Sequence, residues 1–244
     1  MKSAIIIPSR LGSTRLPRKP LQMIAGMTLI ERVYRQCKLA RGIDMVVVAT
    51  DSDEIAKHVN SFGAGAIMTP EDCPNGTDRV AYAARHLADD IDIIMNVQGD
   101  EPLIEQEVIE KMRASFEDAQ VQIATPVAPI LNLEDVTNPN IVKVVTDKSD
   151  NVMYFSRSTI PFDRDNQSRM QYWRHIGLYG FRRKILEEIR HLPSTELEEI
   201  EKLEQLKWLY HGYNIRAVQV ENASIEVNTP ADVRKVEEIL RKKK

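Results

Sequence analysis

Short apolar runs alternate with longer segments of helical periodicity along the first half of this 244-residue chain. The runs have the length and composition of buried strands, and they cover Ala4–Ile7, Met45–Thr50, Ala66–Met68, Ile91–Val97 and Gln122–Val127. The segments between them carry apolar residues at helical spacing, and they cover Leu29–Ala40, Ser52–Ser61, Thr77–Leu87 and Glu105–Phe116. This alternation with short connections predicts an α/β fold, in which a mainly parallel sheet is flanked by helices.

The alternation is weaker after about residue 128. We expect two further strands, an exposed polar loop and two helices, at Val142–Thr146, His175–Phe181, Arg164–Gln171, Ser194–His211 and Pro230–Leu240. No repeat or linker separates these elements. The simplest organisation is therefore a single domain over residues 1–244, with an inserted lobe at about 150–190.

Composition excludes several classes of protein. The chain has 33 Lys and Arg against 36 Asp and Glu, and a net charge of -3 gives no general basic field for nucleic acid. The two cysteines, Cys37 and Cys73, form no CxxC pair, which favours reduced thiols with a structural role. No segment approaches the roughly 20 apolar residues that span a bilayer, and the N-terminal run is too short for a signal peptide. We therefore expect a soluble, cytoplasmic protein.

Positive charge is concentrated in the loop that follows the first predicted strand. Residues Arg10–Leu21 contain four cations, one glycine, two hydroxyl residues and two prolines. Such a loop at the end of a strand suits a polyanion, because glycine permits close approach, amides and hydroxyls donate, and cations balance phosphate charge. The spacing matches neither a Walker A motif nor a GxGxxG turn. A solvated basic turn is the alternative, but it leaves the glycine and hydroxyls unexplained, so the loop predicts a bound nucleoside triphosphate.

Two acidic residues follow the strand predicted at Ile91–Val97. The segment reads Asn-Val-Gln-Gly-Asp-Glu-Pro from Asn96 to Pro102. Mg²⁺ prefers oxygen ligands and often binds one or two carboxylates together with phosphate, and parallel sheets bind ligands at the carboxyl ends of their strands. Asp100 is therefore the candidate Mg²⁺ ligand, although both acids could instead cap the next helix.

A third motif, Asn75-Gly-Thr-Asp-Arg79, opens a predicted helix. Backbone amides at a helix start can receive a base or phosphate oxygen, and Arg79 can donate. From the residues alone, the motif is equally well explained as an N-cap with an acid in the first turn.

These motifs, in this order, resemble the 3-deoxy-manno-octulosonate (Kdo) cytidylyltransferases over nearly the whole chain. The first loop alone would indicate only a broader nucleotidyltransferase superfamily, and three segments narrow the resemblance to Kdo: Gln98–Pro102, Tyr154–Arg157 and Glu204–Leu206. The resemblance implies a Rossmann-like nucleotidyltransferase fold and a homodimer with its interface near Tyr154–Phe181. It also implies transfer of CMP from CTP to the anomeric hydroxyl of Kdo, with release of pyrophosphate, for lipopolysaccharide or capsule.

The resemblance also assigns site residues. It implies Arg10, Lys19 and Asp100 as catalytic residues, with the CTP phosphates bound by Arg10, Ser13, Arg15 and Lys19. The cytidine part would lie near Gly76, Thr77 and Arg79, and the sugar acid near Gln98, Arg157, His175, Glu204 and Gln205. The sugar carboxylate suits Arg157 or His175, and its hydroxyls suit the amide and acid side chains. Without the resemblance, His175 could equally be a buried histidine and Glu204 a surface residue.

One position departs from the family pattern. The family usually has an aspartate as a second magnesium ligand in the segment that reads Glu226-Val-Asn-Thr-Pro-Ala-Asp232 here, so Asn228 is the corresponding ligand. Its amide carbonyl can coordinate Mg²⁺ without supplying charge, and Glu226 would lie on the same face of an extended segment.

Two alternatives stay open: the same chemistry on 8-amino-Kdo or another ulosonic acid, and a non-catalytic nucleotide-binding relative.

Overall fold

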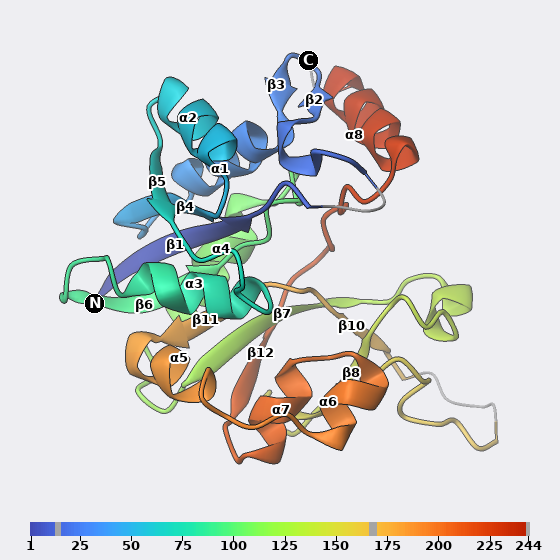
Figure 1. Cartoon of the computed structure of the whole chain (residues 1–244). Helices are drawn as coiled ribbons and strands as arrows, with labels where there is room; N and C mark the ends of the chain where they lie inside the picture. The colour runs from blue at the N-terminus through green and yellow to red at the C-terminus, as the bar shows by residue number, and fades with distance from the viewer. Residues whose placement is uncertain (13–15, 166–169, 243–244) are drawn as a thin grey trace. The chain divides into compact units, whose positions relative to one another are not determined.

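The computed structural model describes residues 1–12, 16–165 and 170–242 (Figure 1). The chain forms two compact units, the first made of residues 1–113 and 224–244 and the second of residues 114–223. The lobe predicted at about 150–190 lies within the second unit, and its role in dimerisation stays a prediction.

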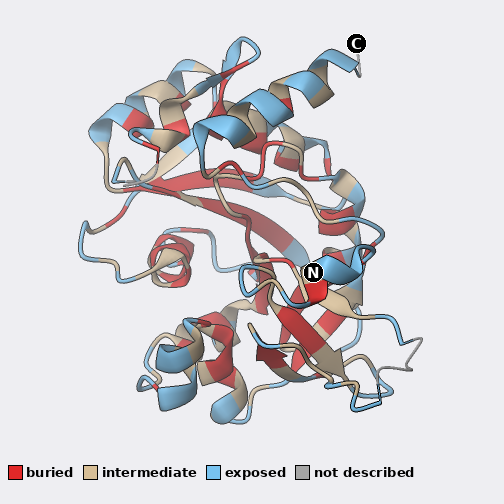
Figure 2. Cartoon of the chain, turned by 90° about the vertical axis from the view of Figure 1, so that its right-hand side faces the viewer, coloured by how far each residue is buried: buried red, intermediate tan, exposed pale blue. Residues whose placement is uncertain are grey.

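The first unit is built on four parallel strands in the order β5-β4-β1-β6. They are β1 (Lys2–Ser9), β4 (Met45–Thr50), β5 (Gly65–Met68) and β6 (Ile91–Asn96). The central strand β1 has neighbours on both edges, and Ala4, Ile5, Ile6 and Ile7 are completely buried, which explains why its sequence is apolar without alternation. Figure 2 shows the sheet as largely buried. The predicted parallel arrangement is confirmed.

Helices α1 (Leu29–Leu39), α2 (Asp53–Ser61), α3 (Gly76–Ala84), α4 (Gln106–Ser115) and α8 (Pro230–Lys242) belong mainly to this unit. In Figure 1, α1 and α2 lie on one side of β1 and α3 lies on the other. Thr28, Ser52 and Asn75 each cap a helix by accepting a hydrogen bond from a first-turn amide. A short 3-10 turn (Lys19–Leu21) and a hairpin of β2 (Met23–Ile24) and β3 (Met27–Thr28) follow the first loop.

The second unit contains β7 (Ile123–Pro129), β8 (Lys143–Thr146), β9 (Val152–Ser156), β10 (Trp173–His175), β11 (Tyr179–Arg182) and β12 (Ile215–Gln219). Strand β12 runs parallel to β7 on one edge, while β10 and β11 pair antiparallel with different parts of the other edge. The prediction of a strand over His175–Phe181 is wrong for its middle, because the chain turns at Ile176–Leu178. There, the Leu178 amide donates to the Ile176 carbonyl over 2.7 Å.

The prediction of one helix over Ser194–His211 is also wrong. The segment forms α6 (Glu196–Glu201) and α7 (Gln205–Tyr210), preceded by α5 (Arg183–Ile189). Lys202 ends α6 in the left-handed conformation, with φ of 53°. The apolar stripe therefore divides: Ile200 is 80% exposed, whereas Leu206 is buried.

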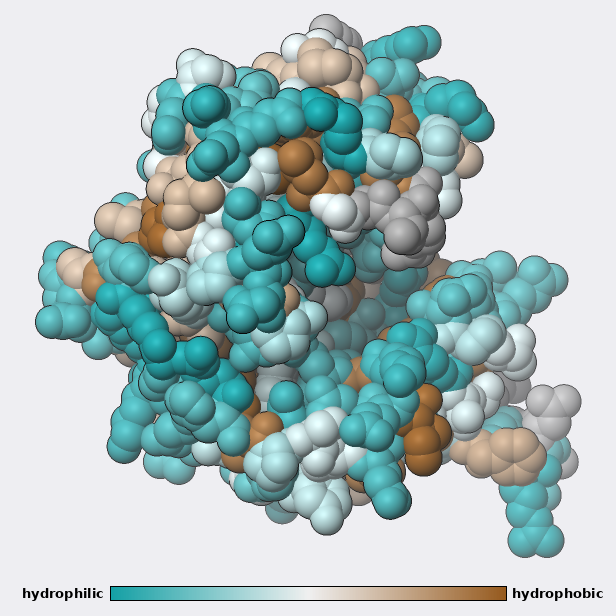
Figure 3. All heavy atoms as spheres, in the orientation of Figure 1, coloured by the Kyte–Doolittle hydropathy of each residue, from teal (hydrophilic) through white to brown (hydrophobic). Residues whose placement is uncertain are grey.

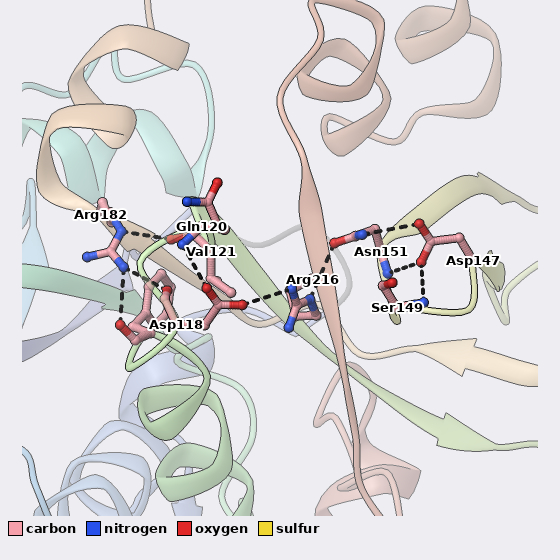
Figure 4. A network of polar contacts seen from close by, with 9 residues as sticks. Asp118, Gln120, Val121, Asp147, Ser149, Asn151, Arg182 and Arg216 are labelled. Carbon is pink, nitrogen blue, oxygen red and sulfur yellow. Dashed lines mark hydrogen bonds and ion pairs between the residues drawn. The ribbon is translucent and has the colours of Figure 1, made fainter.

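A polar network fixes the loops of the second unit (Figure 4). Arg216 of β12 contacts Asp118 and Asn151, each over 3.3 Å, and Arg182 donates to the carbonyls of Phe116, Asp118 and Val121. Hydrogen bonds from Asn151 and Ser149 lower the pKa of Asp147. These contacts join the loop before β7 to β12 and to the β8–β9 turn.

Among the described residues, no helix combines the length and the hydrophobicity needed to cross a membrane. The cytoplasmic location stays a prediction.

Candidate active site

A cavity of about 390 Å³ lies in the first unit, beyond the carboxyl ends of β1 and β6. Its lining includes six residues that the sequence singled out: Arg10, Lys19, Gly76, Arg79, Gln98 and Asp100. The three motifs are separate in sequence, and the parallel sheet brings them together because its strand ends share one edge. Ser13 and Arg15 lie outside the described residues.

Gly99 allows two of these motifs to approach closely. A Cβ atom at this position would lie 3.0 Å from the Pro8 carbonyl oxygen and 3.6 Å from a methyl group of Ile7. A side chain here would therefore push the β6 loop away from the end of β1. This contact places Asp100 beside the loop that begins at Arg10.

Lys19 and Asp100 form an ion pair in the cavity. The Nζ atom of Lys19 donates to Oδ2 of Asp100 over 2.6 Å and to Oδ1 of Asn228 over 2.9 Å. The Asn228 side-chain amide in turn donates to Glu226 over 3.1 Å, and the Val227 amide donates to the Asp100 carbonyl over 2.8 Å. The last segment before α8 therefore reaches the end of β6.

The donor atoms fit a hard divalent cation. Two oxygen atoms, from Asp100 and Asn228, converge on one positive charge, and Mg²⁺ prefers oxygen ligands. The described residues include no group of three or more His, Cys, Asp and Glu side chains placed to hold a metal. Mg²⁺ does not need such a group, because it takes one or two protein carboxylates and keeps water or phosphate ligands.

Arg79 is held by the protein itself. It is 3% exposed, and its guanidinium donates to Asp51 over 2.6 Å, to the Thr69 hydroxyl and to the Pro70 carbonyl. These bonds fix the loop after β5 against the start of α3. A direct contact of Arg79 with the nucleotide stays a prediction, as do the roles of Gly76 and the buried Thr77.

Cys73 could not be assigned to the cavity from sequence, since a lone cysteine carries no motif. The structure places it there, partly exposed, and burial raises the pKa of its thiol. Cys37, by contrast, is fully buried in α1, and burial raises the pKa of this thiol as well.

Four of the residues expected to bind the sugar belong to the second unit, and Gln98 belongs to the first. The Arg157 guanidinium donates to the carbonyls of Glu201 over 2.7 Å, Pro139 over 2.9 Å and Lys202 over 3.4 Å. Its amide also donates to the Glu201 carboxylate over 2.9 Å. Arg157 thus joins the end of β9 to the end of α6.

His175 and Glu204 lie near an aromatic cluster. The His175 ring is 5.5 Å from that of Tyr179, which packs edge-on against Trp208 at 4.9 Å. Burial, and then the charge of Glu204, raises the pKa of Tyr179. The break between α6 and α7 places Glu204 and Gln205 at the start of α7.

Gln205 carries the clearest mark of a ligand site in the second unit. It is 2% exposed, and its Nε2 donor has no hydrogen-bond partner among the described residues. A buried polar group without a partner costs about 1–3 kcal/mol. A ligand oxygen would remove this cost, which agrees with the sugar-binding role expected from the sequence.

Comparison with known proteins gives the family. The cytidylyltransferase family model matches residues 4–218. The 3-deoxy-manno-octulosonate cytidylyltransferase of Myxococcus xanthus is 45% identical over 98% of this chain and 97% of its own length. The enzyme of the same name from Chloroherpeton thalassium is 46% identical over 100% of this chain and 99% of its own.

Comparison with solved structures gives the same family. A CMP:2-keto-3-deoxy-manno-octonic acid synthetase complexed with CTP is 37% identical, with a TM-score of 0.95 over 100% of both chains. The 4-diphosphocytidyl-2C-methyl-D-erythritol synthase of Anaerococcus prevotii is 12% identical with a TM-score of 0.65, over 98% of each chain, and shares the fold. The chain therefore belongs to the cytidylyltransferases and, among them, to the 3-deoxy-manno-octulosonate cytidylyltransferases.

Proposed function

We propose that this protein transfers CMP from CTP to the anomeric hydroxyl of Kdo and releases pyrophosphate. One observation carries the proposal: Arg10, Lys19 and Asp100 meet in a cavity at the carboxyl edge of a parallel sheet. A cavity with these charges suits a triphosphate, and the membership of the chain in the Kdo cytidylyltransferase family specifies cytidine and Kdo.

The cationic loop supplies the groups for the triphosphate. Arg10 is exposed at the end of β1, and Lys19 lines the same cavity. Both charges would stabilise the pyrophosphate as it leaves, in an in-line displacement by the sugar hydroxyl at the α-phosphorus. Catalysis of this kind depends mainly on positioning and on neutralising charge. Ser13 and Arg15 of the same loop would also bind the phosphates.

Asp100 and Asn228 would hold Mg²⁺. When bound, this ion would neutralise phosphate charge and make the attacking hydroxyl more acidic. The oxygen atoms of these two side chains already surround a cation, the ammonium of Lys19. Lys19 would then move its charge from Asp100 to the phosphates as metal and nucleotide bind.

The second unit would bind the sugar acid through Arg157, His175, Glu204 and Gln205. The support is the Nε2 donor of Gln205, which has no partner among the described residues, next in sequence to the acid of Glu204 at the start of α7. Amide donors and acid acceptors suit the several hydroxyls of Kdo.

We propose a homodimer as well. Several large apolar side chains in the second unit are strongly exposed, among them Leu131 at 80%, Leu133 at 75%, Phe162 at 80% and Ile200 at 80%. The face drawn in Figure 3 is mainly hydrophilic, with apolar atoms in separate small groups. If these side chains form one contiguous patch, that patch would suit contact with a partner. Sedimentation velocity on the full chain measures whether the species has a mass of two chains.

A pyrophosphate-release assay tests the function. It crosses CTP, UTP, ATP and GTP with Kdo, 8-amino-Kdo and sialic acid, with and without Mg²⁺. We expect release with CTP and Kdo in the presence of Mg²⁺. Faster turnover with 8-amino-Kdo would identify 8-amino-Kdo as the preferred acceptor. Absence of pyrophosphate release with CTP and any ulosonic acid would overturn the proposal.

A further inference from the structure

The hydroxyl of Thr125 lies against three polar atoms in the interior of the second unit. Thr125 is in β7 and is completely buried. Its Oγ1 atom is 2.7 Å from the Leu178 carbonyl oxygen, 3.2 Å from the Ile176 carbonyl oxygen and 2.9 Å from Nε2 of His175. The hydroxyl thus contacts both the turn between β10 and β11 and the ring that precedes it.

Hydrogen counting assigns the donors in this cluster. A hydroxyl has one hydrogen to donate, and a carbonyl oxygen can only accept. Two oxygen atoms 2.7 Å apart need a hydrogen between them, so the Thr125 hydrogen points to the Leu178 carbonyl. The Nε2 atom of His175 must then be the donor to Oγ1, because the single hydroxyl hydrogen is already used.

The other ring nitrogen follows from this assignment. In a neutral imidazole, one nitrogen donates and the other accepts. The ring is neutral because burial, and then the positive charge of Arg174, lowers the pKa of His175 to about 3. With the hydrogen on Nε2, the Nδ1 atom has a free lone pair.

Neighbouring groups hold the ring in this orientation. Its centroid is 4.9 Å from that of Phe155 in an edge-on contact and 5.5 Å from that of Tyr179. The backbone is fixed on both sides, since the His175 amide donates to Val142 over 2.8 Å and the Ile176 amide donates to Pro126 over 3.0 Å.

We propose that Thr125 is a positioning residue, which holds His175 as the Nε2–H tautomer so that Nδ1 accepts a hydrogen bond from a hydroxyl of the sugar acid. His175 is then not the partner of the sugar carboxylate, which a neutral ring presenting a lone pair would repel. The hydroxyl-binding part of this inference rests on the proposed function, whereas the Thr125–His175 part concerns the free protein.

The tautomer can be measured without substrate. In the full-length protein labelled with ¹⁵N-histidine, two-bond proton–nitrogen spectra at pH 7 distinguish the two neutral tautomers and the charged ring. We expect His175 as the Nε2–H form. The variant Thr125→Val leaves Nε2–H without an acceptor and should shift the ring toward the Nδ1–H form, while Thr125→Ser should restore the wild-type pattern. Thr159→Val is the matched control, because its hydroxyl donates to the Val136 carbonyl over 3.2 Å, away from the His175 ring.

Steady-state kinetics tests the consequence for binding. Thr125→Val should raise the KM for Kdo roughly 3- to 10-fold, the effect of one neutral hydrogen bond, with the KM for CTP changed less than about twofold. Thr125→Ser should bring the KM for Kdo most of the way back to the wild-type value. An Nδ1–H or charged ring in the wild-type protein overturns the proposal even if Thr125→Val does not fold. An unchanged tautomer in Thr125→Val also overturns it, whereas a protein inactive on Kdo with the expected spectra overturns only the proposed function.

Discussion

The Nζ atom of Lys19 lies 2.6 Å from Oδ2 of Asp100, although the two residues are 81 positions apart in the chain. Both side chains are largely shielded, with 16% and 24% of their surface exposed, and shielding strengthens the attraction relative to a pair in open solvent. Asn228 accepts from the same ammonium. A divalent cation bound at Asp100 therefore has to replace this contact.

Removal of either charge should disable the reaction without unfolding the protein. We expect Lys19→Met and Asp100→Asn each to lower CTP-dependent pyrophosphate release roughly 10- to 150-fold, since a charge-assisted contact contributes about 1.5–3 kcal/mol. Lys2→Met is the control, because Lys2 pairs with Asp90 on the surface, where 54% and 57% of the two side chains are exposed. Near-normal release from Asp100→Asn would show that the reaction does not need the charge of Asp100.

A carboxylate in place of the Asn228 amide should strengthen metal binding. The variant Asn228→Asp adds a charge next to Asp100, and hard cations bind more tightly as the number of carboxylates rises. It also replaces the hydrogen bond to Glu226 by repulsion between two acids. We expect tighter Mn²⁺ binding by calorimetry.

The exposed Asn214 offers a matched control for added charge. Asn214→Asp should leave Mn²⁺ binding unchanged. Equal affinities in the wild-type protein and Asn228→Asp would show that residue 228 does not contact the metal.

Cys73 allows the position of the nucleotide to be tested by chemistry. It lines the cavity, whereas Cys37 is completely buried. At pH 8 we expect N-ethylmaleimide to modify Cys73 but not Cys37 in the folded protein, slowly because burial raises the pKa of the Cys73 thiol. CTP should slow this modification in proportion to its occupancy, as mass spectrometry of the peptides would measure. Modification at the same rate with saturating CTP would place the nucleotide elsewhere.

The predictable parts of the structure are those governed by local pattern. Uninterrupted apolar runs such as Ala4–Ile7 predict strands that are buried on both faces of a sheet. The motifs that follow these strands predict the site, because a parallel sheet brings its strand ends to one edge. The break between α6 and α7 depends instead on the left-handed conformation of Lys202. Glycine is the usual sequence signal for this conformation, and it is absent at this position. Likewise, the turn at Ile176–Leu178 depends on the hydroxyl of Thr125, a residue distant in sequence. The bonds of Arg79 to Asp51 and Thr69 could not be predicted either, because they join separate loops.

Lys143 should be a main support of the second unit. It is completely buried, and its ammonium donates to the carbonyls of Asn138 over 2.9 Å, Ile141 over 2.7 Å and Arg157 over 2.5 Å. Lys143→Met leaves these carbonyls unpaired, and we expect a loss of about 2–5 kcal/mol in the free energy of urea unfolding. Lys184→Met, at a side chain 88% exposed, should change this free energy by less than about 0.5 kcal/mol. Equal stabilities of the two variants would contradict the role of Lys143.

The stability of the protein should fall in acid partly because of His175. Its pKa is lowered to about 3 in the folded protein from an ordinary value of 6.5, so between these values the unfolded chain binds more protons at this residue. Stability from this source is complete above pH 6.5 and declines as the pH falls toward 3. His175→Gln keeps a donor near the Nε2 position but does not titrate. After the two curves are aligned at pH 8, the unfolding free energy of the wild-type protein should therefore fall more steeply than that of His175→Gln between pH 6.5 and 4. The difference in slope should correspond to the uptake of up to one proton on unfolding. Parallel curves would mean that the pKa of His175 is the same in the folded and the unfolded protein, and the lowering of this pKa by burial would then be wrong.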